Sequence, residues 1–190
     1  MYNKPMNTAI FLDRDGVIIE NRSDYVRSWL DVSIYHQALQ ALSMLSKLPV
    51  KIFVVTNQSA VGRGIIDLET VHQINQRLLE IIIQNNGRVD GFYICPHLPS
   101  DQCNCRKPEP GLILQAANQF QIDLANSILI GDALSDIQAA QNAGILNTYL
   151  VRTGRGAEQE AMLRDSPISG CVICNDLLTA SRLIITKGQL

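Results

Sequence analysis

An apolar run leads directly into two carboxylates in the stretch Ala9-Ile10-Phe11-Leu12-Asp13-Arg14-Asp15-Gly16. A short apolar run bounded by turn residues is typical of a buried strand in a parallel sheet. In open α/β sheets, ligands bind outside the carboxyl ends of the strands. Carboxylates at this edge therefore predict a metal-assisted site. An Asp- and Gly-containing turn after a strand is the alternative that this stretch alone leaves open.

Further apolar, β-branched runs alternate with segments of helical periodicity. The pattern predicts strands at residues 8–12, 50–56, 89–94, 127–130 and 147–151. It predicts helices at residues 37–48, 68–84, 111–120 and 134–142, followed by a last strand and helix within residues 171–190. Because alternating strands and helices form parallel sheets, the expected fold class is α/β: a three-layer, Rossmann-like parallel sheet with helices on both faces.

Two connecting segments differ from the rest. Residues 19–33 are polar and aromatic and are too short to form a lid domain. We therefore expect a small flap over the strand ends and a capless site that is open to solvent. The stretch Thr153-Gly154-Arg155-Gly156 is glycine-rich, and we expect it to be a mobile connector.

The composition limits the classes of partner. The chain has 190 residues, 46% of them hydrophobic, and a formal net charge of -2. One domain over residues 1–190 is expected, as a monomer. The near-neutral charge and the lack of Lys/Arg runs argue against nucleic acid and membrane surfaces as partners, whereas a small anionic ligand fits. Without a leader-like or membrane-spanning stretch, a cytoplasmic location is expected.

More polar residues are expected at the edge where Asp13 lies. Thr56 ends the second predicted strand, and Lys107 just before a helix can supply a fixed positive charge to phosphate oxygens. Asp132 ends the fourth strand, and Asp136 follows one helical turn later on the same face. Carboxylate oxygens are the ligands that Mg²⁺ prefers. The set predicts a magnesium site that handles phosphate.

In order and spacing, these residues resemble the four motifs of haloacid-dehalogenase-type phosphatases. The resemblance implies that Asp13 attacks phosphorus and forms an aspartyl-phosphate. It implies that Asp15 acts as general acid and then as general base. Thr56 and Lys107 would bind the transferring phosphoryl oxygens.

The same resemblance implies a ligand set for magnesium. The ion would be held by Asp13, the backbone carbonyl of Asp15, and Asp132. Asp136 would orient water or a lysine from behind these ligands.

Cysteine and histidine are concentrated in one Pro-containing loop, at Cys95, His97, Cys103 and Cys105. Three thiolates and one imidazole are the ligand set of a closed tetrahedral Zn²⁺ site. We expect a structural zinc that folds the loop carrying Arg106 and Lys107; four buried residues without a metal are the alternative. Cys171-Val172-Ile173-Cys174 is expected to be a strand before a helix cap rather than a redox or metal motif.

With the Cys/His loop added, the pattern is similar to the capless zinc-loop phosphatases. Residues 56–64, Thr-Asn-Gln-Ser-Ala-Val-Gly-Arg-Gly, are similar to the branch that hydrolyses the C7 phosphate of D-glycero-D-manno-heptose 1,7-bisphosphate in heptose biosynthesis. Histidinol-phosphate phosphatases are the alternative branch, and a non-catalytic phosphosugar-binding module is the alternative of another class. The resemblance implies substrate contacts from Asn21, Asp24, Asn57, Gln58, Ser59 and Arg106. Arg106 would recognise the phosphate that is not cleaved.

Overall fold

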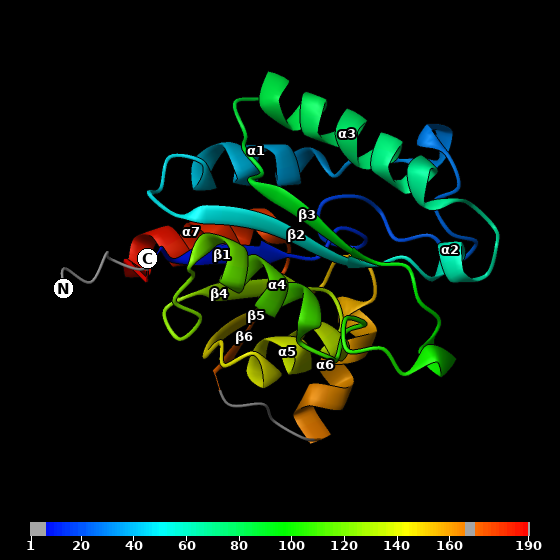
Figure 1. Ribbon diagram of the computed structural model, residues 1–190. Helices are drawn as coiled ribbons and strands as arrows, with labels where there is room; N and C mark the ends of the chain where they lie inside the picture. The colour runs from blue at the N-terminus through cyan, green and yellow to red at the C-terminus, as the bar shows by residue number, and fades with distance from the viewer. Residues whose placement is uncertain (1–6, 166–169, 190) are drawn as a thin grey trace.

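Six parallel strands form one sheet in the order β3-β2-β1-β4-β5-β6 (Figure 1). The computed structural model describes residues 7–165 and 170–189, so parts of the expected domain of residues 1–190 lie outside the described residues. The strands are β1 (Ala9–Leu12), β2 (Lys51–Asn57), β3 (Gly91–Cys95), β4 (Ile128–Gly131), β5 (Asn147–Val151) and β6 (Cys171–Cys174). Each begins and ends within two residues of a predicted run, and Cys171–Cys174 is the expected last strand.

Helices cover both faces of this sheet (Figure 1). One face carries α1 (His36–Leu45), α3 (Leu68–Gln84) and α7 (Leu177–Lys187). The other carries α4 (Gly111–Phe120), α5 (Leu134–Asn142) and α6 (Gly156–Asp165). Short helical turns are α2 (Ser59–Gly62), η1 (Trp29–Asp31) and η2 (Pro99–Asp101). The prediction of a three-layer α/β fold is confirmed, and α2 and α6 are elements that the sequence did not predict.

The strand side chains divide the core into two halves. In β1, Ile10 and Leu12 belong to the cluster under α1, α3 and α7. Ala9 and Phe11 belong to the cluster under α4, α5 and α6. Successive side chains of a strand point to opposite faces, so both faces of a doubly covered strand need apolar residues. This explains why the predicted strands are continuous apolar runs.

Local signals set the helix boundaries. Asp67 caps α3 by accepting a hydrogen bond from the Thr70 backbone N–H at 2.7 Å. Asp176 caps α7 in the same way through the Thr179 N–H at 2.7 Å. Gly144 follows α5 with φ of +89°. Glycine adopts this conformation without the steric cost that other residues meet, so the helix ends there.

The expectation of a mobile connector at residues 153–156 is wrong. Thr153 Oγ1 donates a hydrogen bond to the Gly16 carbonyl at 2.6 Å, and Gly156 begins α6. Gly154 has φ of +61°, and a Cβ placed there would lie 2.2 Å from Asp132 Oδ2 and 2.5 Å from Gly16 Cα. Glycine serves close packing here, not mobility. The segment therefore fastens the loop after β5 to the loops after β1 and β4.

The flap of residues 19–33 lies beside α3. The Arg77 guanidinium of α3 lies 4.8 Å from the centre of the Trp29 ring in η1, a cation–π distance. At the base of the flap, the Glu20 N–H donates to the Ser33 carbonyl at 2.8 Å. The flap therefore contacts α3, and a backbone hydrogen bond joins its two ends.

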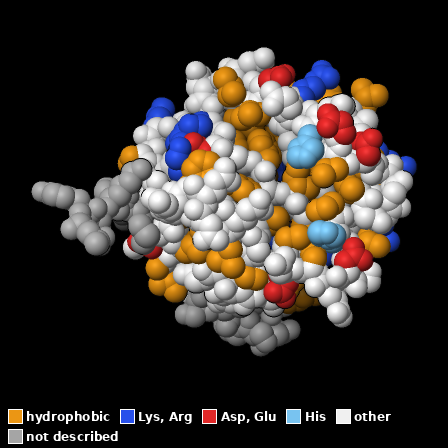
Figure 2. Space-filling model, viewed as in Figure 1, with side chains coloured by type: hydrophobic (Ala, Val, Ile, Leu, Met, Phe, Trp, Pro, Cys, Tyr) orange, Lys and Arg blue, Asp and Glu red, His pale blue; other side chains and the backbone are white. Residues whose placement is uncertain are grey.

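Apolar side chains also reach the surface around the edge strand β3. Leu68, Phe92 and Ile94 line a shallow cavity of about 370 Å³. Figure 2 shows hydrophobic side chains gathered on this face. Among residues 7–165 and 170–189, no helix combines the length and the apolar character that crossing a bilayer requires.

Candidate active site

The direction in which the chain adds strands reverses at β1. From β1 the chain builds β2 and β3 on one side, and it then returns to place β4 on the other side of β1. Ligands bind in the crevice outside the carboxyl ends of the strands at such a switch point. Asp13 follows β1 and Asp132 follows β4. The Asp13 N–H donates to the Ile130 carbonyl at 3.0 Å, so the two strand ends lie side by side.

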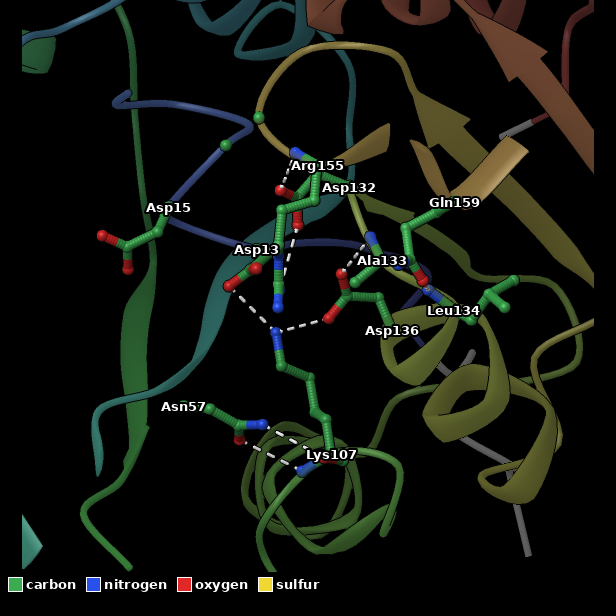
Figure 3. A network of polar contacts seen from close by, with 12 residues as sticks. Asp13, Asp15, Asn57, Lys107, Asp132, Ala133, Leu134, Asp136, Arg155 and Gln159 are labelled. Carbon is green, nitrogen blue, oxygen red and sulfur yellow. Dashed lines mark hydrogen bonds and ion pairs between the residues drawn. The ribbon is translucent and has the colours of Figure 1, made fainter. Parts of the chain in front are cut away.

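Lys107 joins Asp13 to Asp136 (Figure 3). Its Nζ lies 2.9 Å from Asp13 Oδ1 and 2.6 Å from Asp136 Oδ1, and it donates to the Val55 carbonyl at 2.8 Å. An ammonium group has three protons. All three are engaged, so a phosphoryl oxygen would share a proton that Lys107 already directs to one of these acceptors.

Asn57 positions the backbone of Lys107 (Figure 3). Its side-chain Nδ2 donates to the Lys107 carbonyl at 3.1 Å, and its Oδ1 accepts from the Lys107 N–H at 3.1 Å. Asn57 ends β2, whereas Lys107 lies in the loop before α4. In the structure, Asn57 therefore holds Lys107 against the strand ends. Its substrate contact stays a prediction.

Asp15 points away from the cluster of Asp13, Lys107 and Asp136 (Figure 3). Gln58 Nε2 donates to Asp15 Oδ2 at 2.8 Å and to Thr56 Oγ1 at 2.9 Å. The Thr56 hydroxyl in turn lies 3.4 Å from Asp15 Oδ2. Thr56 and Gln58 are both buried. Their side chains, predicted to contact phosphate and sugar, support Asp15 in this structure.

Burial and neighbouring negative charges raise the pKa values of Asp13 and Asp132. Burial, followed by the neighbouring carboxylates of Asp136 and Asp132, raises the pKa of Asp13 to about 8, although Lys107 opposes the shift. Burial and Asp136 raise the pKa of Asp132 to about 6. Burial alone would lower the pKa of Lys107, but the charges of Asp13 and Asp136 outweigh it and raise the pKa. Asp13 thus needs a further positive charge to be an anion at neutral pH.

The carboxylate oxygens of this cluster fit a hard divalent cation. Carboxylate oxygens of Asp13, Asp132 and Asp136 lie within 4.8 Å of one another. Asp13 Oδ1 accepts from Arg14 N–H at 2.7 Å and pairs with Lys107, whereas Oδ2 has no partner within the described part of the chain. Asp132 Oδ1 is buried without a hydrogen bond to any described residue, although Arg155 Nη2 lies 3.5 Å away as an ion-pair partner. Such oxygens are the ligands that Mg²⁺ prefers.

Asp136 differs from the other two acids because both of its oxygens are engaged. Oδ1 pairs with Lys107, and Oδ2 accepts from the Ala133 N–H at 3.0 Å (Figure 3). Asp136 is the third residue of α5, where this backbone bond also caps the helix. These contacts agree with the expected task of orienting a lysine.

The four residues of the Cys/His loop come together as predicted. Sγ of Cys105 lies 3.1 Å from Sγ of Cys95 and 3.5 Å from Sγ of Cys103, and His97 Nδ1 lies 3.2 Å from Cys105 Sγ. Tetrahedral zinc with Zn–S bonds of ~2.3 Å would separate its sulfur ligands by about 3.8 Å. The cysteines are free thiols. The donor set and spacing fit a structural metal such as zinc.

The Cys/His loop also carries two cations to the site. Arg106 Nη1 donates to the His97 carbonyl at 3.2 Å. Lys107 follows directly and enters the carboxylate cluster. Folding of the loop around a metal would therefore fix both side chains.

A cavity of about 360 Å³ opens beside Asp15 and Lys107. Of the predicted substrate residues, those that line it are Asn21, Asn57, Gln58, Ser59 and Arg106. Asp24 is not in this lining; it is exposed and pairs with Arg22 at 3.3 Å. Its substrate contact stays a prediction.

The sequence reasoning missed several residues of this cavity, namely Tyr25, Val26, Ser135 and Arg155. Arg155 comes from the loop after β5; its N–H donates to Asp132 Oδ2 at 2.8 Å, and its Nη2 lies 3.5 Å from Asp132 Oδ1. The rule that carboxyl ends of parallel strands share one edge would have pointed to it. With Arg22, Arg106 and Lys107, it gives the cavity an excess of positive charge suited to phosphate.

Relatives of the chain match nearly its whole length. The D-glycero-β-D-manno-heptose-1,7-bisphosphate 7-phosphatase of Bordetella bronchiseptica is 34% identical over 179 residues, which cover 94% of this chain and 98% of the relative. The enzyme of the same name from Helicobacter pylori is 40% identical over 146 residues, 76% of this chain and 83% of the relative.

Solved structures and a family model agree with these relatives. A crystal structure of the Bordetella bronchiseptica D,D-heptose 1,7-bisphosphate phosphatase, complexed with magnesium and phosphate, superimposes with a TM-score of 0.89 over 95% of this chain and 99% of that chain, at 34% identity. The model of HAD-hydrolase-like proteins matches residues 104–180. The chain therefore belongs to the D-glycero-β-D-manno-heptose-1,7-bisphosphate 7-phosphatase family of HAD-like hydrolases.

Proposed function

We propose that the protein is a Mg²⁺-dependent phosphatase that releases the C7 phosphate of D-glycero-D-manno-heptose 1,7-bisphosphate. The observation that carries the proposal is the placement of Asp13 between Lys107 and Asp132 at the switch point of the sheet. Similarity to heptose bisphosphate phosphatases over nearly the whole chain supports the choice of substrate over histidinol phosphate.

Asp13 would act as the nucleophile through Oδ2. Oδ1 is held by Lys107 and the Arg14 N–H, so the carboxylate cannot turn freely. Attack of Oδ2 on phosphorus forms an aspartyl-phosphate as the bond from phosphorus to the sugar oxygen breaks. Water then attacks the same phosphorus, which releases inorganic phosphate and restores Asp13.

Asp15 would handle the proton in both steps. Its carboxyl group lines the cavity and points away from Asp13, on the side where a leaving oxygen would lie. It gives its proton to the sugar oxygen in the first step and takes one from the attacking water in the second. The acid is thereby regenerated in each cycle.

The Asp13 and Asp132 side chains, with the Asp15 backbone carbonyl, would hold the magnesium. When bound, Mg²⁺ supplies positive charge that favours the ionised form of Asp13 and offsets its repulsion from the phosphate. Lys107 contributes a second, permanent positive charge at the same carboxylate. Asp136 keeps Lys107 in place.

Zinc in the Cys95, His97, Cys103 and Cys105 cluster would have a structural task. Four protein ligands leave no open position for a substrate or water. The loop fixes Arg106 at the cavity wall, where it would bind the phosphate that is not cleaved. A substrate with two phosphates then spans the site from Lys107 to Arg106.

Replacing Asp13 by asparagine tests the proposal. Asp13→Asn keeps the shape of the side chain but removes the nucleophile, so phosphate release should fall to background while the circular dichroism spectrum and zinc content are unchanged. The exposed helix cap Asp67→Asn, which asparagine also fulfils, is the matched control. Near-normal turnover by a folded Asp13→Asn protein would refute the proposal.

A further inference from the structure

Arg14 is the largest side chain that is fully buried in the described part of the chain, at 1% exposure. A guanidinium keeps its charge at all ordinary pH values. Burying such a charge is costly unless specific partners compensate it. The partners of Arg14 should therefore show why a charge is placed there.

Arg14 forms a bidentate pair with the Asp15 carboxylate through two of its nitrogens. Nε donates to Oδ2 at 3.1 Å, and Nη2 donates to Oδ1 at 3.2 Å. Such bidentate pairs fix the plane of the carboxylate as well as its distance. Gln58 and Thr56 reach only Oδ2, so Arg14 is the partner of Oδ1 among the described residues. Asp15 itself is 20% exposed, towards the cavity.

Asn75 of α3 holds the other end of the guanidinium. Its Oδ1 accepts from Arg14 Nη1 at 2.9 Å. Asn75 is 3% exposed, and its Nδ2 is buried without a hydrogen bond to any described group. A buried amide left half-satisfied is destabilising. The hydrogen bond that Asn75 Oδ1 accepts from Arg14 explains why an asparagine stands at this position.

We propose that Arg14, anchored by Asn75, is a positioning residue that holds the Asp15 carboxyl group at the leaving-group side of the cavity; the inference rests on the proposed function. When Asp15 gives its proton to the sugar oxygen and the bond to phosphorus breaks, the carboxylate that forms already faces the guanidinium. Arg14 thus stabilises the charge that develops on the acid without any rearrangement. The chain of contacts runs from α3 through Asn75 and Arg14 to Asp15.

Leaving groups of different quality test this inference. The nitrophenolate of p-nitrophenyl phosphate leaves without protonation, whereas the sugar oxygen of the heptose bisphosphate needs the acid. In Arg14→Lys, kcat for the heptose bisphosphate should fall at least about tenfold more than kcat for p-nitrophenyl phosphate, as part of the roughly 10²- to 10⁴-fold that acid–base catalysis supplies. Asn75→Ala, which keeps the ion pair, should shift the same ratio in the same direction, roughly threefold.

Ile82→Val, a buried change on the same helix, is the control for lost packing and should leave the ratio unchanged. Equal losses on both esters in folded Arg14→Lys would show that Arg14 only ties α3 to the sheet and would overturn the inference. If Arg14→Lys does not fold, an unchanged ratio in Asn75→Ala overturns it. Failure of the unmutated protein to release phosphate from either ester would instead refute the proposed function.

Discussion

Gly154 lies so close to Asp132 that no residue with a side chain fits at position 154. A Cβ at position 154 would lie 2.2 Å from Asp132 Oδ2, and the φ of Gly154 is +61°. The loop after β5 thereby presses the Arg155 N–H onto Asp132, at 2.8 Å. A loop that reads as a flexible connector in sequence is part of the wall behind the proposed magnesium ligand.

Gly154→Ala should therefore weaken magnesium binding at least about tenfold, because the new methyl group displaces the Asp132 carboxylate. Titration calorimetry with Mg²⁺ measures the affinity directly. Gly64→Ala is a matched control, since Gly64 has φ of +68° but a Cβ added there would meet no described atom within 4 Å. It should cost roughly 1–2 kcal/mol of stability and leave the affinity unchanged. Equal affinities in both variants would contradict the prediction.

Lys107→Met should destabilise the protein by about 3–5 kcal/mol, because it leaves the buried Asp13 and Asp136 without their cation. Urea unfolding in the presence of a chelator measures the loss. Lys51→Met breaks a half-exposed pair with Asp90 and should cost about 1 kcal/mol or less. Adding Asp136→Asn to Lys107→Met should recover part of the stability. If the double variant is no more stable than Lys107→Met, loss of the Lys107–Asp136 ion pair does not explain the destabilisation of the single variant.

The raised pKa of Asp13 predicts an unusual pH dependence. Because the pKa rises from 3.8 to about 8 on folding, the folded protein holds a proton that the unfolded chain releases between these values. The contribution of this proton to the stability of the folded protein is fully present below about pH 4 and is lost as the pH rises through 8. Without Mg²⁺, the unmutated protein should thus lose stability relative to Asp13→Asn as the pH rises from about 4 to 8.

Thermal unfolding at several pH values checks this difference. Saturating Mg²⁺ should close the gap, because the cation stabilises the ionised Asp13 and cannot do so for asparagine. Parallel stability profiles of the two proteins, with and without Mg²⁺, would show that Asp13 is already ionised in the folded protein.

Zinc removal should loosen the loop that carries Arg106 and Lys107. A zinc-selective chelator, added in excess Mg²⁺, should lower the melting temperature and reduce kcat/KM at least about tenfold, because neither cation is then held in place. Cys103→Ser should behave in the same way, whereas Cys171→Ser, outside the cluster, should not. Purified protein with no zinc, and with full activity, would contradict the assignment.

Much of the fold and of the site could be predicted from local sequence signals. Runs of apolar residues marked the strands because both faces of the sheet are covered, and Asp13, Lys107, Asp132 and Asp136 were expected together because strand ends share one edge. The helices Leu68–Gln84, Gly111–Phe120 and Leu134–Asn142 begin and end where their periodicity predicted.

What could not be predicted depends on contacts between distant residues. Arg14 and Asn75 are 61 positions apart, and no local pattern shows that a cation in an acidic motif is buried against a helix. The glycines at 154 and 156 favoured the prediction of a mobile connector, because the sequence does not show which atoms lie close to them. Thr56 and Gln58 were expected to face a ligand, yet their side chains are engaged with Asp15. In each case, packing between segments overrode the local interpretation.

Phosphate release in the presence of Mg²⁺, measured as kcat/KM, tests the proposed function most directly. The two anomers of D-glycero-D-manno-heptose 1,7-bisphosphate should be compared with histidinol phosphate, with Asp13→Asn as the inactive control. We expect a strong preference for a heptose anomer over histidinol phosphate, since Arg106 and Lys107 both line the cavity and offer a cation to each of two phosphates. Preference for histidinol phosphate, or no release from any of the three, would contradict the assignment.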